Sequence, residues 1–224
     1  MFGNKSKTGG PVFVKICGIT NEDDALAAID AGADALGFNL VRNSKRYVDI
    51  GGAGVWIDKL PAEICKVAVL ADPNWEDACR ISQLPFIDAL QLHGSETPDF
   101  CRQLADAGIP FTKAVPVTAS QSLANLPNYF TDTLILDSSA GGTFGGTGKP
   151  FPWKFAPEFV RHHPKMNVIL AGGLNPENVA QAVSLVRPRG VDVTTGVEAS
   201  PGRKDHHQVQ AFIRAARSAP DKFA

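Results

Sequence analysis

Short apolar runs alternate along the chain with stretches that have helical spacing. We predict strands at the apolar runs Val12–Cys17, Ala35–Asn39, Lys66–Leu70, Ala89–His93, Phe111–Val115, Leu134–Asp137, Val168–Ala171 and Val191–Thr194. We predict helices between them, of which the clearest are Asn21–Ala31, Pro98–Ala107, Pro176–Val186 and Gln208–Ser218. Thr97 and Asn175 are the expected N-caps of two of these helices, each followed by a proline at the first helical position. Repeated strand–helix units favour a parallel sheet, and eight of them predict a closed (β/α)8 TIM barrel of the α/β class.

The rival fold for this alternating pattern is a doubly wound open sheet. That fold usually carries G-x-G-x-x-G after its first strand, whereas the first strand here ends in KICGIT. The pattern contains neither a linker nor a low-complexity segment. We therefore expect one barrel domain over residues 1–224, with loose ends at about 1–10 and 218–224.

Composition and charge narrow the range of partners. The net charge of the 224 residues is −1, so no global field favours nucleic acid or an anionic membrane. No apolar run approaches the length of a membrane span. The four cysteines form no C-x-x-C pair, and the histidine pairs His162–His163 and His206–His207 lack metal-ligand spacing. We expect a cytoplasmic protein with reduced thiols, no bound metal, and neither a membrane nor a nucleic acid as partner.

Two strands end in residues that can move protons. Asp137 ends the run LILD before a glycine-rich loop, and Cys17 ends the first strand. Barrel enzymes carry their chemistry at the carboxyl ends of the strands, which is where both residues are expected. If Cys17 faces the barrel interior, alternation turns Lys15 inward and Val14 and Ile16 outward. The alternatives are a small buried hydrophobe for Cys17 and a turn or helix cap for Asp137.

Two further features suggest other chemistries. Lys15 and Lys113 are expected to face inward, where a lysine could form a Schiff base in an aldolase, but structural ion pairs are the expected role. The loop GGTFGGTGK resembles a P-loop, yet five residues separate Gly142 from Gly148 and Lys149 precedes a proline. A lid or a substrate-contact loop fits this segment better.

Two turns after the last strands have the features of a phosphate site. AGGLNPENV (171–179) follows strand seven with two adjacent glycines, and TTGVEASPG (194–202) follows strand eight. Small residues let backbone N–H groups approach an anion, and barrels often bind phosphate at this place. The alternative is that the glycines only form tight turns. Because both turns occur together, we favour a phosphate site.

Arg46 and His93 are further candidates for substrate contacts. Arg46 lies in SKRYV after strand two, where its guanidinium could bind a carboxylate through two parallel hydrogen bonds. A solvated surface charge is the alternative for this residue. His93 ends strand four in QLHG, where it could contact substrate or serve as a hydrogen-bonded histidine at the rim of the barrel.

Taken together, these segments resemble the phosphoribosylanthranilate isomerase family of tryptophan biosynthesis. In the family's order they are VKICGIT, GADALGF followed by SKRYV, DALQLHGSETP, LILDSSAGGTFGGTGKPFPW, ILAGGLNPENV and GVDVTTGVEASPGRKD. The resemblance extends from about Val12 to Ser218. It implies a (β/α)8 barrel that converts N-(5-phosphoribosyl)anthranilate to 1-(2-carboxyphenylamino)-1-deoxyribulose 5-phosphate without a cofactor.

The resemblance also implies roles for single residues. Cys17 would be the general base and Asp137 the general acid of an Amadori rearrangement, while Arg46 would hold the anthranilate carboxylate. The other residues that we assign to substrate binding are His93, Gly172, Gly173, Asp192, Thr194, Thr195 and Gly196. Of that set, the backbone of Gly173 and of the two threonines would hold the phosphate.

The chain departs from the usual family pattern near Arg46. Lys45 stands where a proline is common, and NLVRN (39–43) replaces aromatic and Pro-Lys residues.

Two other functions stay open. An isomerase of the related histidine-pathway sugar phosphate uses an aspartate where this chain has Cys17, and a non-catalytic sugar-phosphate sensor would not need both Cys17 and Asp137. Relatives are monomers and dimers, so we expect a monomer or homodimer that binds a small-molecule substrate.

Overall fold

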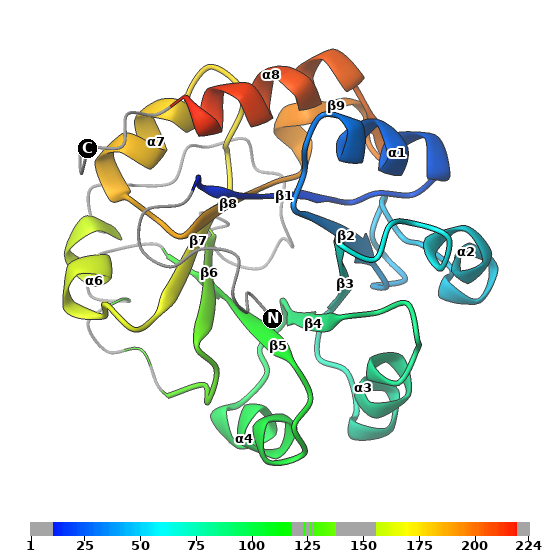
Figure 1. Cartoon of the computed structure of the whole chain (residues 1–224). Coiled ribbons are helices and arrows are strands. Elements are labelled where there is room, and N and C mark those ends of the chain that lie inside the picture. The colour runs from blue at the N-terminus through cyan, green and yellow to red at the C-terminus, as the bar shows by residue number, and fades with distance from the viewer. Residues whose placement is uncertain (1–10, 118–122, 124–125, 127, 138–155, 219–224) are drawn as a thin grey trace.

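Parallel strands close into a barrel around the centre of the molecule (Figure 1). The structure, a computed structural model, describes residues 11–117, 123, 126, 128–137 and 156–218. The barrel strands are β1 (Phe13–Cys17), β2 (Ala35–Asn39), β3 (Cys65–Leu70), β4 (Ala89–Leu92), β5 (Phe111–Pro116), β6 (Thr133–Asp137), β7 (Asn167–Ala171) and β8 (Gly190–Val193). Each strand pairs with the next in chain order, and β8 pairs with β1 to close the ring. Every predicted strand is confirmed to within one residue at each end.

Helices surround the ring of strands on the outside, as Figure 1 shows. They are α1 (Glu22–Asp30), α2 (Ile50–Ile57), α3 (Trp75–Ser82), α4 (Pro98–Asp106), α6 (Ala156–His162), α7 (Val179–Val186) and α8 (His206–Arg217). The predicted (β/α)8 barrel is therefore confirmed. The expected loose ends, apart from Ser218, and the loop after Asp137 lie outside the described residues. The assignment of the whole chain to one domain stays a prediction.

Side chains divide between the two faces of the barrel as the alternation predicts. Val14 and Ile16 of β1 belong to the main hydrophobic core between strands and helices, whereas Lys15 between them forms an ion pair within the ring. A smaller apolar cluster joins neighbouring inward positions of β5, β6 and β7, namely Ala114, Ile135, Ile169 and Ala171. The barrel is thus a packed core, and its functional groups must gather at its rim.

The start of α7 differs from the prediction. We expected a helix from Pro176 with Asn175 as its N-cap, but α7 begins at Val179. The Asn175 side chain accepts hydrogen bonds from the backbone N–H groups of Glu177 and Asn178, each at 3.0 Å, and so closes a turn. Asn178 in turn donates to the carbonyl of Gly173 at 2.9 Å. The two asparagines hold the turn after β7 in place, and the helix begins only after that turn.

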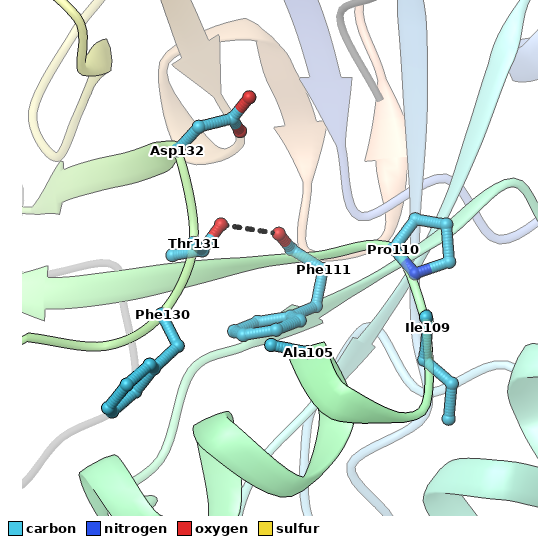
Figure 2. A pocket seen from close by; sticks show the side chains of 8 residues that line it. Ala105, Ile109, Pro110, Phe111, Phe130, Thr131 and Asp132 are labelled. Atoms are coloured by element: carbon cyan, nitrogen blue, oxygen red, sulfur yellow. Dashed lines mark hydrogen bonds between the residues drawn. The ribbon is translucent and has the colours of Figure 1, made fainter.

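A hollow at the amino-terminal ends of β5 and β6 lies away from the predicted site (Figure 2). It is lined by Ala105, Gly108, Ile109, Pro110, Phe111, Phe130, Thr131 and Asp132. The Thr131 hydroxyl donates a hydrogen bond to the carbonyl of Phe111 at 2.8 Å and ties the two strand starts together. Since Asp137 stands at the other end of β6, this hollow is at the amino-terminal end of the barrel, opposite the end at which barrel enzymes carry their active sites.

Candidate active site

Cys17 and Lys15 share one space inside the barrel. Cys17 is the last residue of β1 and is paired in register with Gly37 of β2. A Cβ atom at position 37 would lie 2.6 Å from the Cys17 sulfur and 3.0 Å from the Lys15 Nζ atom. The missing side chain of Gly37 therefore makes room for both the thiol and the ammonium group.

Lys15 and Lys113 form the ion pairs expected of them. The Lys15 ammonium lies 3.0 Å from the carboxylate of Asp192, its register partner on β8. Burial opposes the Lys15 charge, but Asp192 and Cys17 outweigh it, so the pKa of Lys15 is raised above its ordinary value. Lys113 lies 2.9 Å from Glu96 and donates to the Gly94 carbonyl at 2.8 Å. Both lysines are engaged in buried ion pairs, so neither is available as the free amine that a Schiff-base nucleophile requires.

Arg46 lies against the carboxyl end of β1. Gly18, the residue after Cys17, has a φ angle of +74°, and a Cβ atom there would lie 2.8 Å from the Arg46 Cδ atom. The same Cβ atom would lie 3.0 Å from the Thr194 side chain. A parallel bridge between Asn39 and Tyr47 brings the chain of Arg46 back beside the end of β2. The fold thus assembles Cys17, Arg46 and Thr194 around one glycine.

A carboxylate that the sequence analysis missed holds Arg46. Glu198 opens a small hairpin of β9 (Glu198–Ser200) and β10 (Arg203–Lys204) that follows β8. It accepts hydrogen bonds from the Arg46 Nε and Nη2 atoms at 2.8 and 2.6 Å, and from Lys204 at 3.2 Å. Burial alone would raise the pKa of Glu198, but the Arg46 hydrogen bond and the Lys204 charge lower it below its ordinary value.

Glu198 binds the edge of the Arg46 guanidinium that carries Nε and Nη2. The Nη2 atom also donates to the Thr195 hydroxyl at 3.2 Å, whereas Nη1 has no partner among the residues that the structure describes. The Arg46 side chain is 15% exposed, so the Nη1 edge faces the rim of the barrel. A guanidinium held this way is oriented before any anion arrives.

Asp137 and His93 meet at the carboxyl ends of β6 and β4. Asp137 is the last residue of β6 and is 6% exposed. The His93 Nε2 atom lies 3.2 Å from its Oδ2 oxygen. On the other side of the ring, the His93 Nδ1 atom lies 3.1 Å from the amide nitrogen of Gln91. The structure therefore brings His93 to the predicted acid, and Gln91 is a further member of the site that the sequence analysis missed.

The turns after β7 and β8 touch each other. Gly172 and Gly173 have positive φ angles of 81° and 66°, and β8 is followed by a short 3₁₀ turn, Thr195–Val197. A Cβ atom at Gly196 would collide with the carbonyl oxygen of Leu174, so only glycine allows this contact. Within the described part of the chain, no acceptor is found for the backbone N–H groups of Gly173, Thr195 and Gly196. Such groups at two adjoining turns form the cradle that an anion requires.

Metal and membrane features are not found in the described residues. No group of three or more histidine, cysteine, aspartate or glutamate side chains there could hold a metal ion. None of the described helices is long and apolar enough to cross a membrane.

Comparison with known proteins assigns this arrangement to a family. Residues 14–215 match the family model for N-(5'phosphoribosyl)anthranilate (PRA) isomerase. The chain belongs to this family. It is 42% identical over 204 residues to N-(5'-phosphoribosyl)anthranilate isomerase of Geobacter sp. (strain M21), covering 91% of this chain and 97% of that protein. The resemblance stated from the sequence is thereby confirmed.

Solved structures of isomerases in the same family have the same fold. The phosphoribosyl anthranilate isomerase of Thermotoga maritima superposes with a TM-score of 0.84 at 38% identity, covering 92% of this chain and 98% of that chain. The enzyme of Thermus thermophilus gives a TM-score of 0.80 at 32% identity, with 93% and 100% covered. A further isomerase structure, with a TM-score of 0.79 at 37% identity and 92% and 98% covered, contains reduced 1-(O-carboxyphenylamino)-1-deoxyribulose 5-phosphate.

The residues assigned to the isomerase site fall into three groups on the described structure. Around the end of β1 lie Cys17, Arg46, Asp192, Thr194 and Thr195. His93 and Asp137 form the second group, and the turns that contain Gly172, Gly173 and Gly196, which follow β7 and β8, form the third. Asp192 is buried against Lys15, with which it forms an ion pair. Its role in substrate binding stays a prediction.

Proposed function

We propose that this chain performs the isomerase reaction with Cys17 as general base and Asp137 as general acid. The observation that carries the proposal is the order of the groups around the barrel rim. Asp137 ends β6, the two anion-binding turns follow β7 and β8, and Cys17 ends β1, which pairs with β8. A sugar whose phosphate sits on the two central turns would have the acid on one side and the base on the other.

The proposed reaction is an Amadori rearrangement in which protons balance. Asp137 gives its proton to the furanose ring oxygen as the bond from C1′ to that oxygen breaks, which leaves a Schiff base. Cys17 as thiolate then removes the proton from C2′, and the electron pair of that bond forms the enolamine. A proton added at C1′ and one lost from the C2′ hydroxyl give the ketone. Uptake equals release, so general acid–base catalysis is sufficient for the whole conversion.

Arg46 is proposed to bind the anthranilate carboxylate through its open Nη1 edge. Glu198 holds the other edge, so the guanidinium keeps its orientation while the substrate enters and leaves. A charged hydrogen bond at this half-buried place is stronger than one in open solvent. The backbone N–H groups of Gly173, Thr195 and Gly196 are proposed to bind the phosphate, with the short 3₁₀ turn directed at it.

The assembly and location of the protein are proposed from its relatives and its cysteines. A structure of the Thermotoga maritima isomerase describes monomers made from a dimeric enzyme. We propose a monomer or homodimer that works in the cytoplasm, where the four free thiols would stay reduced. Light scattering of the purified chain gives the mass in solution and decides between the two assemblies.

One assay tests the proposed reaction against its alternatives. Phosphoribosylanthranilate is generated in the cuvette, and the loss of its fluorescence is followed after addition of the chain. The histidine-pathway sugar phosphate is supplied in a parallel reaction. We expect turnover of the first substrate and none of the second. Turnover of the second substrate would contradict the specificity, and binding of both without turnover would indicate a sensor.

A further inference from the structure

A short chain of polar side chains runs along the inside of β4 toward the proposed acid. Gln91 and His93 are two residues apart, so both point into the barrel. Gln91 is 1% exposed, and its amide nitrogen lies 3.1 Å from His93 Nδ1. His93 Nε2 lies 3.2 Å from Asp137 Oδ2. The backbone N–H of His93 donates to the Leu70 carbonyl at 2.8 Å, which fixes the base of the side chain.

We propose that Gln91 fixes His93 as the neutral tautomer protonated on Nε2, and that His93 thereby donates a hydrogen bond to Oδ2 of Asp137. Gln91 and His93 are positioning residues in this arrangement, and Asp137 alone transfers the proton. The inference deepens the proposed function, since it assumes that Asp137 is the general acid.

The first step of the argument is the hydrogen count on the ring. A neutral imidazole carries one donor and one acceptor. After Asp137 has given up its proton, its carboxylate only accepts, so a neutral ring facing Oδ2 must carry its hydrogen on Nε2. Nδ1 is then the acceptor, and the Gln91 amide nitrogen beside it is the donor that it needs. All hydrogen bonds in the chain run in one direction, from Gln91 through His93 to Asp137.

The opposite tautomer would work against catalysis. With the hydrogen on Nδ1, the Nε2 lone pair would face Asp137 Oδ2 at 3.2 Å. A protonated Asp137 would then give its proton to a hydrogen bond with the ring instead of keeping it for the ring oxygen of the sugar. An ionised Asp137 would face a lone pair with its own lone pairs, which is repulsive. The tautomer therefore decides where the proton of the acid is held.

The surroundings of Gln91 favour the orientation that this tautomer needs. Its Oε1 atom is buried without a hydrogen-bond partner among the described residues. If the amide were turned over, Oε1 would face the ring and the NH2 group would occupy that partnerless place. Buried N–H groups without a partner are rarer than under-satisfied carbonyl groups. The observed orientation thus has the smaller cost of the two.

The same bond holds the Oδ2 oxygen of Asp137 in place. His93 donates to Oδ2 whether Asp137 is protonated or ionised, because the ring hydrogen stays on Nε2. The side chains of His93 and Asp137 are 22% and 8% exposed, so the pair stands at the rim where a sugar would bind. The Asp137 carboxyl group is therefore oriented by His93 before substrate binds.

The experiment begins with the tautomer itself. Nitrogen-15 NMR of the histidine side chains distinguishes the two neutral tautomers, and His93→Gln identifies the signals of His93 by their loss. In the unsubstituted protein at pH 7 we expect the His93 ring to be neutral, with its hydrogen on Nε2. In Gln91→Glu we expect a hydrogen on Nδ1, because the new carboxylate accepts a hydrogen bond from Nδ1–H. Hydrogen on Nδ1 in the unsubstituted protein would overturn the proposal. This readout needs no turnover, so it is independent of the proposed function.

Kinetics of matched variants supply the second readout. We expect Gln91→Glu to lower kcat by about 10²-fold, the lower range for loss of acid catalysis, with KM changed by less than about threefold. Gln91→Met should fall between this variant and the unsubstituted chain. Thr112→Val is the control, since Thr112 is the register partner of Gln91 on β5 and has a buried hydroxyl without a partner in the described residues.

The outcomes separate the two proposals. An equal loss of kcat in Thr112→Val and Gln91→Glu would overturn the positioning role of Gln91, because any substitution in the barrel interior would then be enough to lower kcat. Unchanged kcat in Gln91→Glu would overturn it as well. Full activity of Asp137→Asn would instead refute the role of the acid, while the tautomer measured by NMR would still stand.

Discussion

Single residues in this site have environments that match opposite tasks. Lys15, Arg46 and Lys204 each lie close enough to Cys17 for their charges to interact with its thiolate. Asp137 instead lies 3.2 Å from the Nε2 atom of His93. The proposed base and the proposed acid thus stand in different electrostatic surroundings.

Removal of the base tests the first of these environments. We expect Cys17→Ala to lower kcat by about 10²- to 10⁴-fold, the usual contribution of a general base. KM should change little, because the proposed phosphate and carboxylate contacts do not involve the thiol. Steady-state kinetics under conditions where chemistry limits the rate check this result. Near-normal turnover of the alanine variant would exclude Cys17 as the base.

Replacement of the acid by its amide tests the second environment. Asp137→Asn should nearly abolish turnover, since an amide keeps the shape of the side chain but cannot deliver a proton to the ring oxygen. Product affinity, measured by titration, should stay within about tenfold because the phosphate and carboxylate anchors remain. If the asparagine variant turned over at a normal rate, another acid would have to be found in the pocket.

At the scale of the elements, strand ends could be predicted from the sequence better than the turns that follow them. Cys17 and Asp137 each close an apolar run, and the end of such a run is visible in the sequence. The hairpin that carries Glu198 and Lys204 has strands too short to show a two-residue period. Asn175 illustrates another limit, because an asparagine that caps a helix and one that closes a turn have the same sequence signal.

Side chains inside the barrel were the other part that the sequence could not give. Alternation identifies which face a strand residue takes, and it correctly turned Lys15 inward. Alternation says nothing about which strand across the ring supplies a partner. The pairing of Arg46 with Glu198, 152 positions apart, and the reach of His93 to Asp137 therefore required the closed fold.

The elements that hold Arg46 lead to a prediction about binding. Arg46→Ala should weaken binding of a ligand with an anthranilate carboxylate by roughly 1.5–3 kcal/mol, the range for a hydrogen bond to a charged group. Binding of plain ribose 5-phosphate should change much less, because that ligand has no carboxylate to meet the Nη1 edge. Calorimetric titration of both ligands measures the difference. Equal losses for both would show that Arg46 does not bind the carboxylate.

For the whole molecule, buried charges join the two ends of the folded chain. Lys15 of β1 pairs with Asp192 of β8 across the seam that closes the barrel. Asp24 of α1 accepts from the backbone N–H of Lys204 at 2.9 Å and from the His206 ring at 2.8 Å. These contacts join residues 177 to 182 positions apart, and loss of one partner of the Lys15–Asp192 pair would leave an unpaired buried charge at the seam.

Low pH should lower the free energy of unfolding through protonation of Glu198. The folded pKa of Glu198 is lowered, so its contribution to stability is fully present above the unfolded value of about 4.3 and is lost as pH falls through the folded value. Glu198→Gln should cost about 3–5 kcal/mol at pH 7, because Arg46 and Lys204 lose their shared partner. Below about pH 4.3 the unfolding free energy of the variant should fall less steeply than that of the unsubstituted chain.

Urea unfolding at a series of pH values measures both effects. Arg80→Ala, which removes only an exposed pair with Asp77, serves as the control and should leave the unfolding free energy nearly unchanged at each of these pH values. Parallel curves for Glu198→Gln and the unsubstituted chain would show that Glu198 does not link stability to pH.

Gly37 has a consequence for how relatives of this protein can diverge. Because a side chain at position 37 would enter the space of the Cys17 sulfur and the Lys15 ammonium group, substitutions at these positions are not independent in their effects on fitness. In a library that varies positions 15, 17 and 37 together and is selected for tryptophan synthesis, survivors with Cys17 and Lys15 should retain glycine at 37. Lineages that acquired a larger residue at 37 would first have had to give up this base, and with it this route through the reaction.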